Sequence, residues 1–214
     1  MGLDYTAGCV NFRDVGEFLT LLSGESWLPP GRLLRGGRLD VVESALDIGS
    51  PGTVINLRAG PDRLGFPTHV VHRPAENSLE KYDTSDKRVR RWLRQVVGVF
   101  EDDTLPYPVL VHCTSGKDRT GIVVAALLSV LGVPEQWITE EYLLSDGEVQ
   151  AAWIGQALGG SATLRTTFPA STWTACELPS PAPIEHTHFP LQKSGCAFEN
   201  LSSVGGALAE ADVH

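Results

Sequence analysis

The sequence has little cysteine, and its four cysteines lie far apart. Cys9, Cys113, Cys176 and Cys196 form no Cys-x-x-Cys pair and no cysteine–histidine cluster with the spacing of a zinc site. We therefore expect neither a bound metal nor another cofactor. The pattern is also typical of a protein whose thiols stay reduced.

Long apolar runs are missing as well. No stretch approaches the roughly 18 apolar residues that a membrane-spanning helix needs, and residues 1–5 lack the basic and apolar regions of a secretory signal. The net charge of −9 argues against a general nucleic-acid-binding protein, which is normally basic. We expect a cytoplasmic protein without a membrane span or a nucleic-acid partner, and the sequence leaves its oligomeric state open.

The order of the local signals predicts an α/β domain. Short β-branched runs bounded by proline and glycine predict strands at 53–58, 69–72 and 109–111. Apolar residues at helical spacing predict helices at 89–100, 119–131 and 135–144. The second of these helices is apolar on nearly every side, so we expect it in the interior. A capping box at Ser145–Glu148 predicts the start of a last helix.

The helix predicted at 89–100 has a strongly basic outer face. Its basic residues are Lys87, Arg88, Arg90, Arg91 and Arg94. A solvated helix face is the simpler interpretation of such a run. The alternative is a basic rim that attracts phosphorylated substrates.

The composition changes near residues 159–160. From there to the end, the chain is rich in proline, serine, threonine and alanine, and no apolar period is sustained. We therefore divide the chain into a domain at 1–158 and a tail at 159–214 with little ordered structure. A natural linker and an altered reading frame both fit this tail.

The segment 112–121, His-Cys-Thr-Ser-Gly-Lys-Asp-Arg-Thr-Gly, joins a predicted buried strand to a predicted buried helix. Free N–H groups at a helix start form a cradle for an anion, and Gly116 permits a tight curl of the backbone. Arg119 follows Cys113 closely enough to return its planar guanidinium to the same centre, where it matches two phosphate oxygens. The predicted phosphate-binding residues are Thr114, Ser115, Gly116, Lys117, Asp118 and Arg119.

Cys113 stands at the base of this predicted cradle. Because donors that hold a phosphate dianion also stabilise a thiolate, we expect Cys113 to attack phosphorus and form a cysteinyl-phosphate that water then hydrolyses. His112 flanks the cysteine and Thr120 is placed to donate a hydrogen bond to its sulfur, so we expect both to support the thiolate. A Cys-x5-Arg pattern alone is weak, and the surrounding strand, glycine and helix give it weight.

This loop resembles the HCxxGKxRTG signature of protein tyrosine and dual-specificity phosphatases. Its Lys117-Asp118 pair resembles the bacterial branch that includes the mycobacterial secreted phosphatase and related lipid-phosphatase-like enzymes. Asn11–Gly16 resembles the NFRDxG motif of that branch, and Gly31–Arg35 resembles its GRLxR strand. Residues 56–58, Asn-Leu-Arg, stand where many members have Asp-Leu-Arg.

The resemblance implies a single cysteine-phosphatase domain with a central, mostly parallel sheet flanked by helices and the cysteine loop at its carboxyl edge. It also implies activity without a metal. Substrates in this branch range from phosphotyrosine to phosphoserine, phosphothreonine and phosphoinositides, and Lys117 adds a positive charge suited to polyanionic head groups. Arg13 and Asp14 are expected to brace the site.

The leaving group needs a proton, so a carboxylic acid should lie near the loop. The resemblance favours Asp118 first. Glu76 is the second candidate and Asp83 the third, because both lie in the segment that precedes the basic helix. Asp62 lies in a Gly-Pro-Asp sequence and is interpreted as a turn former.

Two other functions compete with a phosphomonoester hydrolase. A catalytically weak pseudophosphatase would bind phosphorylated partners without hydrolysing them, although Cys113 and Arg119 are both present. A rhodanese-type sulfurtransferase also uses a cysteine in a curled loop. The Gly-Lys-Asp-Arg-Thr-Gly run favours phosphate over either alternative.

Overall fold

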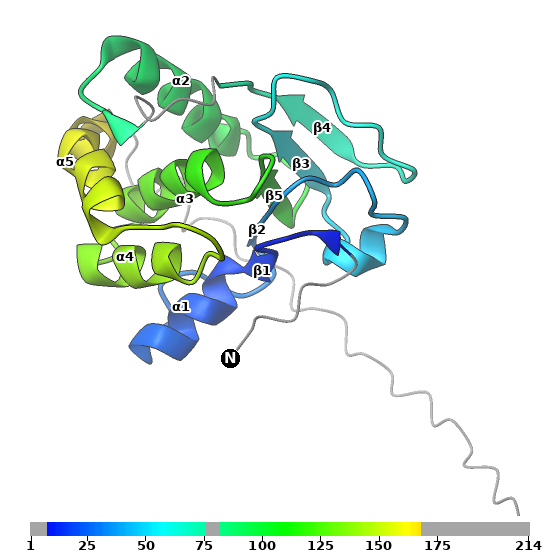
Figure 1. The fold of residues 1–214 in the computed structure, drawn as a ribbon, viewed down its shortest axis with the longest axis horizontal. Helices are drawn as coiled ribbons and strands as arrows, with labels where there is room; N and C mark the ends of the chain where they lie inside the picture. Colours follow the sequence, from blue (N-terminus) through cyan, green and yellow to red (C-terminus); the bar gives the residue numbers. More distant parts are fainter. Residues whose placement is uncertain (1–7, 76–81, 168–214) are drawn as a thin grey trace, which may run out of the picture. The chain divides into compact units, whose positions relative to one another are not determined.

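The computed structural model describes residues 8–75 and 82–167, and a five-stranded sheet lies at the centre of this region. Its strands are β1 (Arg13–Asp14), β2 (Leu33–Gly36), β3 (Thr53–Asn56), β4 (His69–His72) and β5 (Val109–His112). Their order across the sheet is β1-β2-β5-β3-β4. β1 runs antiparallel to β2, and all other neighbours are parallel. The predicted α/β fold with a mostly parallel sheet is confirmed (Figure 1).

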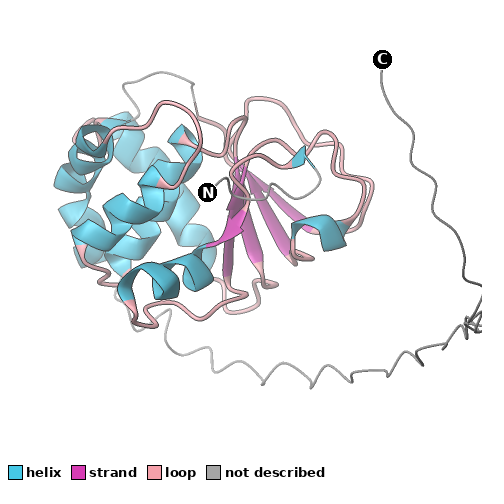
Figure 2. Cartoon of the chain, turned by 60° about the horizontal axis from the view of Figure 1, so that its bottom comes forward, coloured by secondary structure: helices cyan, strands magenta, loops and turns pink. Residues whose placement is uncertain are grey.

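Helices connect the strands and also follow the last of them. They are α1 (Val15–Ser23), η2 (Ala45–Ile48), α2 (Lys87–Val97), η4 (Gly98–Glu101), α3 (Asp118–Val130), α4 (Glu135–Leu143) and α5 (Ala151–Thr167). The α-helices gather on one side of the sheet (Figure 2). Each of them contributes side chains to the larger apolar core. The other face of the sheet is covered more thinly, by η2 and the chain before it.

β5 lies in the middle of the sheet and is buried on both faces. Val109 and Val111 face the larger core, whereas Leu110 faces the smaller one. This alternation arises because successive side chains of a strand point to opposite faces. A strand with parallel neighbours and two covered faces is apolar throughout, which explains why the sequence Val-Leu-Val predicts it.

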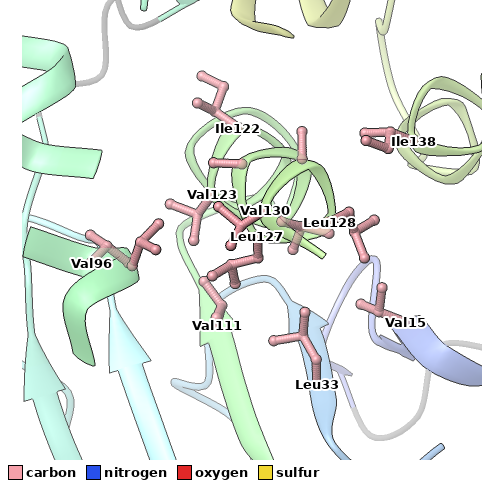
Figure 3. Packing of buried hydrophobic residues seen from close by; sticks show 14 of the residues in the cluster. Val15, Leu33, Val96, Val111, Ile122, Val123, Leu127, Leu128, Val130 and Ile138 are labelled. Carbon is pink, nitrogen blue, oxygen red and sulfur yellow. The ribbon is translucent and has the colours of Figure 1, made fainter. Parts of the chain in front are cut away.

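Helix α3 follows the cysteine loop and runs through the centre of the helical layer. Every residue from Arg119 to Val130 is buried. Figure 3 shows its side chains among Val111 of β5, Leu33 of β2 and Val96 of α2. The predicted internal helix is therefore confirmed. Because its first turn continues directly from the loop, the core fixes the position of the loop's end.

The C-terminal part of the domain differs from the prediction in two ways. Ser145 does not cap a helix, because its hydroxyl oxygen lies within hydrogen-bonding distance of both Arg13 and Arg35, and α5 begins only at Ala151. Helix α5 then runs past the boundary predicted after residue 158. The rest of the predicted tail, residues 168–214, lies outside the described residues. Among the described helices, none has both the length and the apolar character to cross a membrane.

Candidate active site

The loop between β5 and α3 begins at Cys113 and ends at Lys117. Since β5 occupies the middle of the sheet, the loop leaves the carboxyl edge between the ends of β2 and β3. This is the position at which open α/β sheets generally bind ligands. Cys113 is 1% exposed and its thiol is free. The structure therefore places the predicted nucleophile at the base of the loop, against the core.

Three consecutive carbonyl groups of the loop are held from outside it. The carbonyls of residues 114–116 accept hydrogen bonds, in order, from the backbone N–H of Arg38 (3.0 Å), from Asn11 Nδ2 (2.8 Å) and from the Arg35 guanidinium (2.8 Å). The C=O and N–H of a trans peptide point in opposite directions. Holding the carbonyls from outside the loop therefore turns the N–H groups of the same peptides the opposite way, which is the arrangement that an anion cradle requires.

Gly116 makes the curl possible. Its φ is +66°, in the left-handed region that favours glycine. A Cβ at this position would lie 2.5 Å from the carbonyl carbon of Gly36 and 2.6 Å from the nitrogen of Gly37. The loop thus packs directly on the backbone at the end of β2, and the predicted tight curl is present.

Arg119 returns to the start of the loop from the first turn of α3. One terminal nitrogen donates to the hydroxyl of Thr114 at 3.0 Å, and the other donates to the carbonyl of Leu57 at 3.1 Å. The side chain is largely buried, and its Nε has no hydrogen-bond partner among the described residues. The guanidinium therefore lies beside the residue that follows Cys113, with N–H capacity left for an anion.

The two residues predicted to support the thiolate differ in their hydrogen bonds. His112 Nε2 lies 2.7 Å from Asp62 Oδ2, and its Nδ1 has no hydrogen-bond partner among the described residues. The buried hydroxyl of Thr120 also lacks one there, so the hydrogen bond predicted from Thr120 to the sulfur is not formed in this structure. Asp62, predicted to be only a turn former, has instead a buried side chain that contacts the residue before the nucleophile.

The three candidate acids occupy different places. Asp118 begins α3, and its Oδ1 accepts a hydrogen bond from the hydroxyl of Tyr82 at 2.7 Å. Burial, together with the contact of Tyr82 with the Tyr142 hydroxyl and with Asp118, raises the pKa of Tyr82 far above its usual value, so Tyr82 stays a donor. Asp83 accepts from the backbone N–H and the hydroxyl of Ser85, which ties it to the turn before α2. Glu76 lies outside the described residues.

A buried carboxylate supports the site from α4. Glu141 accepts hydrogen bonds from Arg13 at 2.8 Å and from Arg35 at 2.6 Å, and all three side chains are at most 1% exposed. Burial alone would raise the pKa of Glu141, but the two guanidinium groups outweigh it and hold the pKa below its usual value of 4.5. Arg35 also donates to the carbonyl of Gly116, so Glu141 orients a side chain that holds the loop.

The motif at Asn11–Gly16 forms a capped turn, and its asparagine reaches the cysteine loop. Asn11 has a φ of +59°, which asparagine tolerates better than most residues. Besides the loop carbonyl, it bonds the backbone of Asp146, with the N–H of Asp146 donating at 2.6 Å. Asp14 caps α1 by accepting from the N–H groups of Gly16 and Glu17.

Comparison with known proteins decides the family. The sequence profile of the tyrosine phosphatase family matches residues 5–175. The chain belongs to this family. It is 50% identical over 200 residues to the triple specificity protein phosphatase PtpB of Mycobacterium tuberculosis. The match covers 66% of this chain and 68% of PtpB. A tyrosine-protein phosphatase of Nostoc commune is 54% identical over 37 residues, 17% of this chain and 13% of that protein.

Solved structures of phosphatases also match. TpbA of P. aeruginosa aligns with a TM-score of 0.49 and 25% identity, over 64% of this chain and 86% of that one. OH1 from the Orf virus, titled a tyrosine phosphatase with triple substrate specificity, aligns with a TM-score of 0.42 and 15% identity, over 60% of this chain and 80% of that one.

The chain is thus a protein-tyrosine-phosphatase-like enzyme of the bacterial branch that the sequence motifs resemble. This membership decides against the sulfurtransferase alternative.

Sequence reasoning had found the loop residues and the two N-terminal motifs, but it missed Glu141, Tyr82 and the role of Asp62. Glu141 gave no signal, because a glutamate in an amphipathic helix is normally exposed.

Proposed function

We propose that this phosphatase acts without a metal, through a cysteinyl-phosphate on Cys113. The arrangement of the loop supports the proposal: its carbonyls are bound outward, and Arg119 returns to the residue beside the nucleophile. N–H groups turned inward would hold the equatorial oxygens of a phosphoryl group. His112 precedes Cys113 at the end of β5, and Thr120 lies buried in the first turn of α3.

The reaction would proceed in two displacements. The Cys113 thiolate attacks phosphorus in line with the ester oxygen, so that an S–P bond forms while the P–O bond breaks and the leaving oxygen takes a proton from Asp118. Water then attacks the phosphorus, its proton passes to the Asp118 carboxylate, and the S–P bond breaks. Inorganic phosphate and the thiolate are released, and every atom and charge is restored.

Asp118 is favoured as the acid over Asp83 by its place. It directly follows loop residues 113–117, and the Tyr82 hydroxyl fixes one of its oxygens. The other oxygen, Oδ2, has no hydrogen-bond partner among the described residues and is free for proton transfer. Lys117 stands between Gly116 and Asp118 and contributes positive charge beside the cradle.

The test combines two variants with two leaving groups. Cys113→Ser should abolish turnover of p-nitrophenyl phosphate in buffer containing a chelator, and vanadate should inhibit the wild type. Asp118→Asn should lower kcat/KM, which reports the steps up to the first displacement, far more for a phosphoserine peptide than for p-nitrophenyl phosphate, because p-nitrophenolate leaves without help from an acid. Undiminished activity of Cys113→Ser would refute the cysteine mechanism. Equal losses for the two leaving groups would refute the role of Asp118.

We further propose that the enzyme accepts phosphoserine, phosphothreonine and phosphoinositides besides phosphotyrosine; its similarity to PtpB, a triple specificity protein phosphatase, supports a broad specificity. Helix α2 supports this breadth: five of the chain's 17 lysine and arginine residues fall in it and it has no acidic residue, whereas the whole chain has a net charge of −9. Beside it lies a cavity of about 470 Å³ lined by His72, Arg73, Pro74, Trp92 and Gln95.

A short segment, residues 73–75, links the lining of this cavity to Arg119. Trp92 of α2 donates to the carbonyl of Arg73, and two residues later Ala75 accepts from Arg119 at 3.4 Å. Reversing two exposed charges of α2, Arg91→Glu with Arg94→Glu, should lower kcat/KM for a phosphoinositide about tenfold or more while p-nitrophenyl phosphate is unaffected. An equal effect on both substrates would contradict a role of α2 in substrate choice.

A further inference from the structure

The turn that follows β3, residues 56–62, contacts both sides of the cysteine loop. At its start, the carbonyl of Leu57 accepts from Arg119, and the N–H of Leu57 donates to the carbonyl of His112 at 3.0 Å. At its end, Asp62 contacts the imidazole ring of His112. One short segment thus touches the residue before the nucleophile and the arginine that closes the phosphate cradle.

The contact between Asp62 and His112 is buried. The two side chains are 2% and 0% exposed, and Oδ2 lies 2.7 Å from Nε2. A carboxylate oxygen this close to a ring nitrogen requires a proton on that nitrogen, because two lone pairs would repel each other. A neutral ring and a charged ring both meet this condition, so the hydrogen bond fixes the orientation of the ring in either state.

The geometry of the turn shows that Asp62 does more than shape the backbone. Asn56 supplies the bonds that define the turn, since its Oδ1 accepts from the N–H of Arg58 at 2.7 Å and its Nδ2 donates to the carbonyl of Gly60 at 3.0 Å. Asp62 forms no hydrogen bond to a backbone N–H among the described residues. Its second oxygen lies 3.7 Å from Arg58, whose guanidinium is already bonded to Asp40 at 2.7 Å.

We propose that Asp62 is a positioning residue for the phosphatase reaction, acting through His112. Asp62 holds the His112 ring at the end of β5. It thereby fixes the position of Cys113, the next residue, relative to the Leu57 carbonyl that holds Arg119. In-line attack depends on this alignment, because a displacement of about 1 Å at the reacting atoms costs about 100-fold in rate. The proposal rests on the proposed role of Cys113.

The test compares variants of Asp62 in steady-state hydrolysis of p-nitrophenyl phosphate. Asp62→Ala and the polar but shorter Asp62→Ser both remove the bond, and each should lower kcat about 10- to 100-fold while KM changes little. Asp62→Asn should retain kcat within a few-fold, because its amide oxygen accepts the same N–H. Asp102→Asn is the matched control: Asp102 is an exposed turn residue that accepts from the N–H of Thr104, and its variant should equal the wild type.

A double-mutant cycle with His112→Ala identifies the route of the effect. If Asp62 acts through the ring, Asp62→Ser should cause no further loss of kcat in the His112→Ala background, and additive losses would overturn the proposal. It would also be overturned if Asp62→Ser had the kcat of Asp102→Asn, if Asp62→Asn lost as much as Asp62→Ser, or if the loss only matched the fraction unfolded at the assay temperature. Activity in Cys113→Ser is a separate outcome, which refutes the cysteine mechanism itself.

Discussion

Replacing Glu141 with glutamine removes the carboxylate that Arg13 and Arg35 share. Both guanidinium groups are fully buried and lie 2.6–2.8 Å from the carboxylate. When the charge of the carboxylate is lost, neither guanidinium can turn to water. Breaking a buried ion pair by removing one partner costs about 3–5 kcal/mol. Because one carboxylate serves two arginines here, we expect the upper part of that range, about 4–5 kcal/mol, which is a large share of the stability of a typical domain.

Thermal unfolding followed by circular dichroism measures this loss. For a chain of this length, each kcal/mol lowers Tm by about 2–4 °C, so Glu141→Gln should unfold roughly 8–20 °C below the wild type. Glu140→Gln is the matched control, because Glu140 is the exposed neighbour on the same helix, and its change should stay within about 0.5 kcal/mol. If the two variants unfolded at the same temperature, the buried contacts of Glu141 with Arg13 and Arg35 would not stabilise the domain as argued.

Two further predictions concern acid and the curl of the loop. Since the folded pKa of Glu141 is depressed, its stabilising effect is present above its unfolded pKa near 4.5 and is lost as pH falls through the folded value. The Tm difference between wild type and Glu141→Gln should therefore be smaller at about pH 4 than at pH 7. A constant difference would contradict this. Gly116→Ala should lower kcat about 100-fold or more, because the added Cβ would clash with the backbone of Gly36. Gly132 has a similar φ of +81° but open space around it, so Gly132→Ala should cost only about 1–2 kcal/mol of stability. Equal activity of the two variants would contradict the close approach of the loop to Gly36.

The elements nearest the loop could be predicted because their signals are local. A continuous apolar run predicts β5, an apolar surface on every side predicts α3, and a cysteine, a glycine and an arginine at fixed spacing predict the curl between them. Each of these signals lies within a few residues of the structure it specifies. The start of α5 was wrong for the opposite reason: Ser145 matched a capping box locally, but two arginines far away in sequence occupy its hydroxyl.

The residues that sequence reasoning missed share a dependence on long-range contacts. Asp62 meets His112 only because β3 and β5 are adjacent in the sheet, and Glu141 meets Arg13 and Arg35 only because α4 packs beside α1. In the sequence, an aspartate after proline is an ordinary turn residue, and a glutamate in a short helix is an ordinary surface acid. Their burial is a property of the fold and has no local signature.

The two N-terminal motifs gain a physical meaning from the same contacts. A cradle of N–H groups needs its carbonyls bound elsewhere, because an unpaired buried carbonyl is costly. Asn11 and Arg35 supply two of those bonds from separate segments, and Glu141 orients Arg35 through a buried charge pair. The proposed catalytic geometry therefore depends on side chains outside the loop, and weakening Glu141 should reduce activity as well as stability, since it releases the donor that holds Gly116.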